Sequence, residues 1–144
     1  FLMSKANKKG NTYLCDTFEG FVEEEKFHKK NHFVYKNIDE VRKNVKRLKL
    51  KNTKIYKCKF PNKLSVSFKK KKFKLCHLDV NTYKSTKESF QFIQSRIVRG
   101  GVIVFDDYGW WGYSAQKLAL DPIASKHNLE ILELPTGQGL LIKS

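Results

Sequence analysis

The sequence has few cysteines, no long apolar run and little arginine, and each shortage excludes a class of protein. Its three cysteines, Cys15, Cys58 and Cys76, are far apart and show none of the paired spacings of a zinc site. Each lies in or beside an apolar run, so we expect reduced, buried thiols in a cytoplasmic protein. No run approaches the roughly 20 apolar residues that cross a bilayer, and the first residues show no signal-peptide pattern. A membrane partner is therefore not expected.

Arginine is scarce although the net charge is +15. Of the 29 basic residues, Arg occupies only positions 42, 47, 96 and 99, and the densest lysine run, Lys69–Lys72, falls in a predicted turn. Because the planar guanidinium is the preferred reader of phosphates and bases, this composition argues against a nucleic-acid partner. A basic nucleic-acid-binding module with a degenerate α/β fold is still an alternative, which one contiguous basic face would favour.

Apolar periodicity predicts strands alternating with helices along the chain. Strands are expected at 12–15, 54–60, 73–80 and 102–105. Helices are expected at 37–48, 85–97 and 114–126, the last with Pro122 inside it, and a terminal hairpin at 129–134 and 138–143. Gly100 and Gly101 are expected to turn the chain into the 102–105 strand. This order predicts an α/β fold with a mostly parallel, Rossmann-like sheet and a C-terminal antiparallel hairpin.

Three of these strands end in carboxylates, at Asp16, at Asp79 and at the pair Asp106 and Asp107. Ligands of an open parallel sheet gather at the carboxyl ends of its strands. Crowded carboxylates resist ionisation unless a cation joins them, and hard oxygen ligands suit Mg²⁺. Aspartates that only form turns and helix caps fit the same spacing equally well. His28 and His32, one helical turn apart, are expected as solvated loop side chains.

Three segments resemble the macrocin O-methyltransferase family. Residues 79–86, Asp-Val-Asn-Thr-Tyr-Lys-Ser-Thr, resemble its Asp-x-Asp-x-Tyr-x-Ser-Thr signature. Residues 100–109, Gly-Gly-Val-Ile-Val-Phe-Asp-Asp-Tyr-Gly, resemble its next motif, and residues 16–21, Asp-Thr-Phe-Glu-Gly-Phe, are similar to the segment after its second strand. The resemblance extends from about Thr12 to Ser144.

The resemblance implies a class I methyltransferase fold and methyl transfer from S-adenosylmethionine to a hydroxyl of a small molecule, such as a sugar or a natural-product glycoside. By position it implies a divalent metal, Mg²⁺ or another cation, on Asp79, Asp106 and Asp107, with Asp79 also catalytic. It places Asp16, with Thr17 and Phe18, at the cofactor ribose.

The sequence departs from the family pattern in ways that matter for catalysis. Asn81 occupies the second acidic position of the signature, so the base would be Asp79 itself or His77, or the chain is an inactive relative kept as an interaction protein. Cys58 stands where a glycine is expected near the adenine. No Gly-rich loop precedes Asp16, which predicts a single domain, 1–144, truncated at its N-terminus and lacking its first, central strand.

An aromatic cluster follows the second acidic motif, at Tyr108, Trp110, Trp111 and Tyr113. Flat aromatic faces suit a sugar ring or a phenol, which favours an acceptor-binding wall formed by Tyr108, Trp110 and Trp111. A lid or a subunit contact, as in a homodimer, is the alternative interpretation.

Overall fold

The computed structural model describes residues 1–21, 37–112 and 114–144. The chain divides into two compact units, Phe1–Leu64 and Ser65–Ser144, which are described separately. His28, His32 and Tyr113 lie outside the described residues, and the single domain stays a prediction. Within the described parts, no helix is long and apolar enough to cross a membrane.

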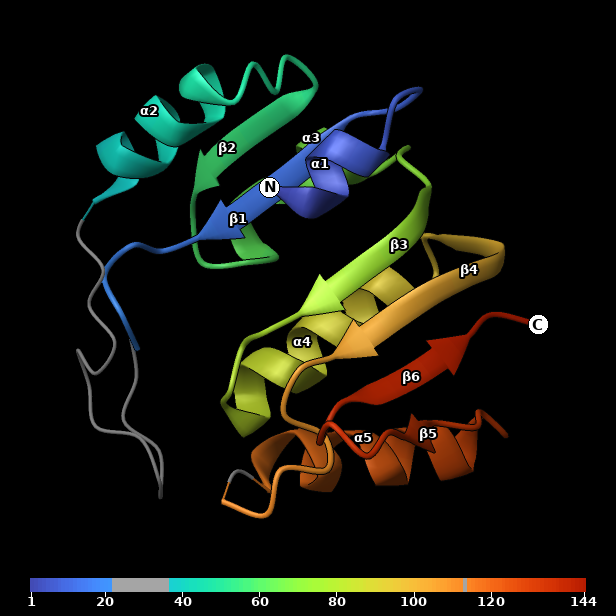
Figure 1. Ribbon diagram of the computed structural model, residues 1–144. Helices are drawn as coiled ribbons and strands as arrows, with labels where there is room; N and C mark the ends of the chain where they lie inside the picture. Colours follow the sequence, from blue (N-terminus) through green and yellow to red (C-terminus); the bar gives the residue numbers. More distant parts are fainter. Residues whose placement is uncertain (22–36, 113) are drawn as a thin grey trace. The chain divides into compact units, whose positions relative to one another are not determined.

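The first unit is built on two parallel strands (Figure 1). Its elements are α1 (Leu2–Ala6), β1 (Thr12–Asp16), α2 (Ile38–Arg47), β2 (Thr53–Lys57) and the short 3-10 turn η1 (Asn62–Leu64). The side chain of Asn37 accepts a hydrogen bond of 3.0 Å from the backbone N of Glu40, which caps α2 as the sequence predicts. Asp16 is the last residue of β1, so its carboxylate lies at the carboxyl end of the parallel pair.

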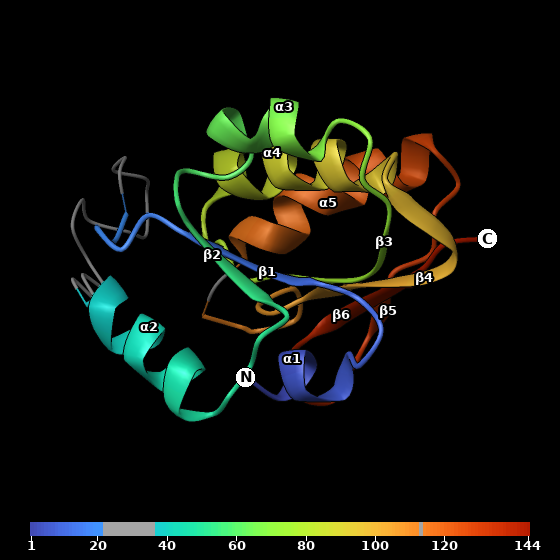
Figure 2. The same ribbon diagram turned by 90° about the horizontal axis from the view of Figure 1, so that it is seen from above.

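The second unit carries a four-stranded sheet in the order β3-β4-β6-β5 (Figure 1). Its elements are α3 (Ser65–Phe68), β3 (Phe73–Leu78), α4 (Tyr83–Gln94), β4 (Ile97–Phe105), α5 (Ala115–Lys126), β5 (Leu132–Glu133) and β6 (Gly139–Ile142). Helices α4 and α5 lie on the same face of this sheet (Figure 2). Phe105 is fully buried between sheet and helices, with its ring 5.6 Å from that of Phe90 on α4.

The predicted alternation of strands and helices is confirmed, but the single, mostly parallel sheet is not. The described strands form two separate sheets, and the larger one is mixed: β3 pairs with β4 in parallel, whereas β6 pairs antiparallel with both β4 and β5. The terminal hairpin supplies both antiparallel pairs because it joins the sheet through β6. Among the described residues, β1 pairs with β2 and β3 pairs with β4.

Several boundaries in the second unit differ from the sequence prediction, among them the starts of β4 and α4. β4 begins at Ile97 and continues through the two glycines, which form an irregularity in the ladder instead of a turn. Gly100 has φ of +71°, and a Cβ on Gly101 would lie 2.8 Å from the backbone oxygen of Val98. α4 begins at Tyr83, because the side chain of Thr82 caps it by accepting a hydrogen bond from Ser85 N.

Candidate metal and active site

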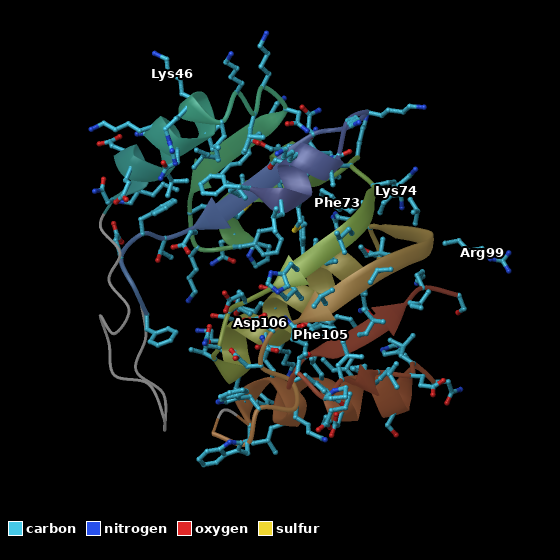
Figure 3. The ribbon with its side chains drawn as sticks, in the orientation of Figure 1. Lys46, Phe73, Lys74, Arg99, Phe105 and Asp106 are labelled. Atoms are coloured by element: carbon cyan, nitrogen blue, oxygen red, sulfur yellow. The ribbon has the colours of Figure 1, made fainter. Side chains whose placement is uncertain are left out.

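Three carboxylates meet where β3 and β4 end. Leu78 and Phe105 are register partners at the ends of these parallel strands, and Asp79 and Asp106 are the next residues along each strand. Figure 3 shows Asp106 at this end of β4 and Arg99 at the other. One carboxylate oxygen from each of Asp79, Asp106 and Asp107 lies within 4.8 Å of the other two. The structure therefore brings together the three residues that the sequence analysis assigned to a metal.

The carboxyl of Asp107 lies in surroundings that disfavour its charged form. Burial raises the pKa of its carboxyl above the ordinary value, the negative charges of Asp106 and Asp79 raise it further, and His77 lowers it. Its Oδ2 is buried and accepts no hydrogen bond from the described residues. A buried carboxylate oxygen without a donor is costly, and a cation is the group that would satisfy it.

Asp106 is held by two side chains from different elements. Nε2 of His77, on β3, lies 3.0 Å from Asp106 Oδ1, and Nε2 of Gln138 donates a hydrogen bond of 2.9 Å to the same oxygen. Gln138 directly precedes β6, so the hairpin contributes to the site. Contacts of this kind orient a metal ligand and limit its rotamers.

The donor set and its spacing fit a hard divalent cation. All three candidate ligands are carboxylates, the type that Mg²⁺ and Ca²⁺ prefer. Two oxygens on one Mg²⁺ at about 2.1 Å lie about 3 Å apart when adjacent and about 4.2 Å apart when opposite. Around Ca²⁺ the opposite pair reaches about 5 Å. Three oxygens at the 4.8 Å limit would each lie about 2.8 Å from a common centre, so binding of either ion needs each carboxylate oxygen to move inward by less than about 1 Å.

The residues expected at the cofactor form a tight turn after β1. Asp16 Oδ1 accepts a hydrogen bond of 2.6 Å from Phe18 N, and Phe18 has φ of +55°. The hydroxyl of Thr17 donates to Gly20 O and accepts from Glu19 N. Asp16 is exposed and Thr17 and Phe18 are half-buried. The Asp16 side chain thus both shapes this turn and presents a carboxylate at the strand end.

The three aromatic residues with a predicted acceptor role occupy different surroundings. Tyr108 is buried, and its hydroxyl donates a hydrogen bond of 2.5 Å to Asp121 Oδ1 on α5. Burial first, and then this bond, raise the pKa of the tyrosine above its ordinary value. Trp110 and Trp111 are 47% and 93% exposed, and Trp110 packs against Gly137 in the hairpin turn. The exposed wall therefore consists of the two tryptophans, whereas Tyr108 anchors the loop that carries them.

Asn81, at the second acidic position of the signature, lies directly before the cap of α4. Its φ of +44° is a left-handed conformation that asparagine tolerates better than most residues. This conformation reverses the chain between Asp79 and the Thr82 cap of α4.

Sequence reasoning missed Gln116, Gln138 and Asp121, which support the site from α5 and the hairpin. For Gln116 a signal was present. It falls on the buried stripe of α5 with Ala115, Ala119 and Leu120. A polar side chain on such a stripe must find hydrogen-bond partners inside the protein.

The arrangement of the strands matches solved methyltransferases. The O-methyltransferase NovP is 16% identical, with a TM-score of 0.73 over 99% of this chain and 64% of NovP. The apo structure of CalS11, described as a TDP-rhamnose 3'-O-methyltransferase of calicheamicin biosynthesis, is 13% identical, with a TM-score of 0.68 over 92% of this chain and 58% of CalS11. SMU.1697c, a putative methyltransferase from Streptococcus mutans in complex with SAH, is 12% identical, with a TM-score of 0.55 over 92% of this chain and 87% of that protein. The protein therefore has an α/β fold of the class I methyltransferase type.

The sequence itself defines the family. The profile of the macrocin O-methyltransferase (TylF) family matches residues 1–130, and the chain belongs to this family of S-adenosylmethionine-dependent O-methyltransferases. No individually curated protein matches the chain in sequence. The chain spans less than two thirds of the length of NovP and of CalS11.

Proposed function

We propose that this chain provides the acceptor side of a divalent-metal-dependent O-methyltransferase that acts on a hydroxyl of a sugar or natural-product glycoside. The observation that carries the proposal is the meeting of three carboxylate oxygens within 4.8 Å, together with a buried oxygen of Asp107 that accepts no hydrogen bond from the described part of the chain. Asp79, Asp106 and Asp107 would hold the cation. When bound, the cation would lower the pKa of an acceptor hydroxyl and fix the position of its oxygen.

The protein side chains have separate roles in this proposal. His77 and Gln138 hold Asp106 in place through Oδ1. Trp110 and Trp111 present exposed indole faces on the loop that follows Asp107, where the apolar face of a sugar ring can stack. Asp79, the most exposed of the three aspartates, is the candidate to accept the acceptor's proton because Asn81 cannot. The substrate of CalS11 supports a nucleotide sugar as the first acceptor to test.

The residues of this chain fit only part of the cofactor. Asp16 offers a carboxylate for the ribose hydroxyls, but none of the eight glycines lies in a strand–Gly-x-Gly–helix element for the methionine end. We therefore propose that tight cofactor binding needs an additional strand and Gly-rich turn. Calorimetric titration with S-adenosylhomocysteine should show weak or no binding to residues 1–144. Micromolar binding by this chain would contradict the proposal.

Methyl transfer by the intact protein, meaning residues 1–144 together with this additional strand and turn, tests the proposed function. With S-adenosylmethionine and TDP-rhamnose, the release of S-adenosylhomocysteine should stop in EDTA and return with Mg²⁺. Asp106→Asn should lower the rate by at least tenfold. The matched control is Asp39→Asn, which removes an exposed carboxylate that pairs with Arg42 on α2. Equal rates in EDTA and Mg²⁺ would refute the role of the metal, and equal losses for both variants would refute the assignment of Asp106.

A further inference from the structure

Gln116, in the first turn of α5, is a buried polar residue that contacts the backbone of the carboxylate cluster. Its side chain is fully shielded from solvent. Its Oε1 accepts a hydrogen bond of 3.0 Å from Asp107 N, and its Nε2 donates one of 3.1 Å to Leu78 O. One amide therefore touches the backbone of both segments that carry the carboxylates.

The two hydrogen bonds of Gln116 connect backbone groups at the ends of β3 and β4. Leu78 O accepts from Asp106 N at 3.0 Å as well as from Gln116, and Leu78 directly precedes Asp79. Asp107 lies beyond the end of β4, and its backbone N donates a hydrogen bond to the Gln116 side chain instead of to a neighbouring strand. The Gln116 amide thus adds a second link between the backbones of the two segments, beside the direct bond from Asp106 N to Leu78 O.

Few side chains can make both contacts from this position. The site needs one donor and one acceptor at the end of a four-atom side chain, and an ionised glutamate has no donor. An apolar side chain of similar size would leave the Asp107 N–H and one lone pair of Leu78 O buried without a partner. The buried side chains of Ala115, Ala119 and Leu120 pack α5 independently of the Gln116 amide, so a change of this amide alone leaves that packing in place.

We infer that Gln116 is a positioning residue for the cation site, acting through the backbone of Asp107 and Leu78 to hold the three carboxylates at binding distance. The inference rests on the proposed function, since it needs a cation on these carboxylates. A support of this kind typically changes metal affinity by 10- to 100-fold when it is removed.

The test is calorimetric titration of the intact protein with Mn²⁺, comparing the wild type with Gln116→Met. Methionine keeps the length and volume of the side chain and removes both hydrogen bonds. The dissociation constant should rise at least tenfold. The control is Leu120→Val at a fully buried position one turn further along α5, where the loss of one methylene group should lower the melting temperature. Its dissociation constant should stay within twofold of the wild type.

The outcomes separate the two proposals. No Mn²⁺ binding by the wild type would refute the proposed metal site itself. Binding by the wild type with equal affinity in Gln116→Met, or an equal loss in Leu120→Val, would overturn the role of Gln116 alone. If Gln116→Met does not fold, amide hydrogen exchange in the wild type decides the matter. The Asp107 amide should exchange slowly without cation, and exchange at the rate of an unprotected amide would overturn the inference.

Discussion

Replacing Asp107 with Asn should have opposite effects on stability with and without a cation. Without a cation, Asp107 brings a third negative charge to within 4.8 Å of two others. At that distance one pair of charges costs about 0.9 kcal/mol in a water-like dielectric and about 3.5 kcal/mol at an effective dielectric constant of 20. Because the cluster is partly exposed, the lower figure applies to each of the two pairs that Asp107 makes, and the variant should be more stable in EDTA by about 2 kcal/mol.

The cation reverses this order. A ligand at 100 times its dissociation constant stabilises the folded wild type by about 2.7 kcal/mol. The variant lacks one of three ligands and should gain little. Urea unfolding in EDTA and in excess Mg²⁺ measures all four free energies, with Asp39→Asn as the surface control. A variant that is less stable than the wild type in EDTA, or that gains as much from Mg²⁺, would refute the reasoning.

The effect in EDTA has a defined pH dependence. The folded pKa of Asp107 lies above its ordinary value of 3.8. The carboxyl is therefore protonated in both states below pH 3.8, and its charge destabilises the folded state progressively as pH rises toward the raised pKa. The extra stability of Asp107→Asn over the wild type should be absent below pH 3.8, grow between pH 3.8 and the raised pKa, and stay constant at higher pH. An advantage that grows as pH falls would contradict the assigned cause.

Three further predictions follow from individual residues. Phe105→Ala should lower the free energy of unfolding by about 3–5 kcal/mol, measured in urea, because it removes a fully buried ring packed on Phe90; a loss below about 1 kcal/mol would contradict this packing. Burial raises the pKa of Cys76 to about 12, so iodoacetamide at pH 8 should label this half-buried thiol much more slowly in the native protein than after unfolding, as judged by mass spectrometry; equal rates of labelling before and after unfolding would disprove it. Trp111→Ala should change stability by less than about 0.5 kcal/mol, because the side chain is 93% exposed, but lower kcat/KM for TDP-rhamnose; an unchanged kcat/KM would remove Trp111 from the acceptor site.

Much of the fold was predictable because its signals are local. Strand-like segments that end in aspartate mark β3 and β4, and parallel strands necessarily bring their ends to one edge, so Asp79 and Asp106 could be paired from sequence. The hairpin around Gly137, which has φ of +83°, was equally visible. These features depend on a few neighbouring residues.

The remaining features depend on distant contacts. Nothing near Gln116 in sequence shows that its amide reaches Leu78, 38 residues earlier. Tyr108 was predicted at the acceptor because it lies among aromatics, yet Asp121 on α5 engages its hydroxyl. The strands form two sheets because of the way they pair. Which strands pair is determined by the whole chain and cannot be read from any single strand.

Anomalous diffraction from a crystal of the intact protein soaked in Mn²⁺ tests the central claim most directly. The account predicts one strong peak at the ends of β3 and β4, bonded to a carboxylate oxygen from each of Asp79, Asp106 and Asp107. A matched crystal of Asp106→Asn should show a weaker peak or none. No peak at the strand ends of the wild type, or a peak that contacts none of the three aspartates, would contradict the account.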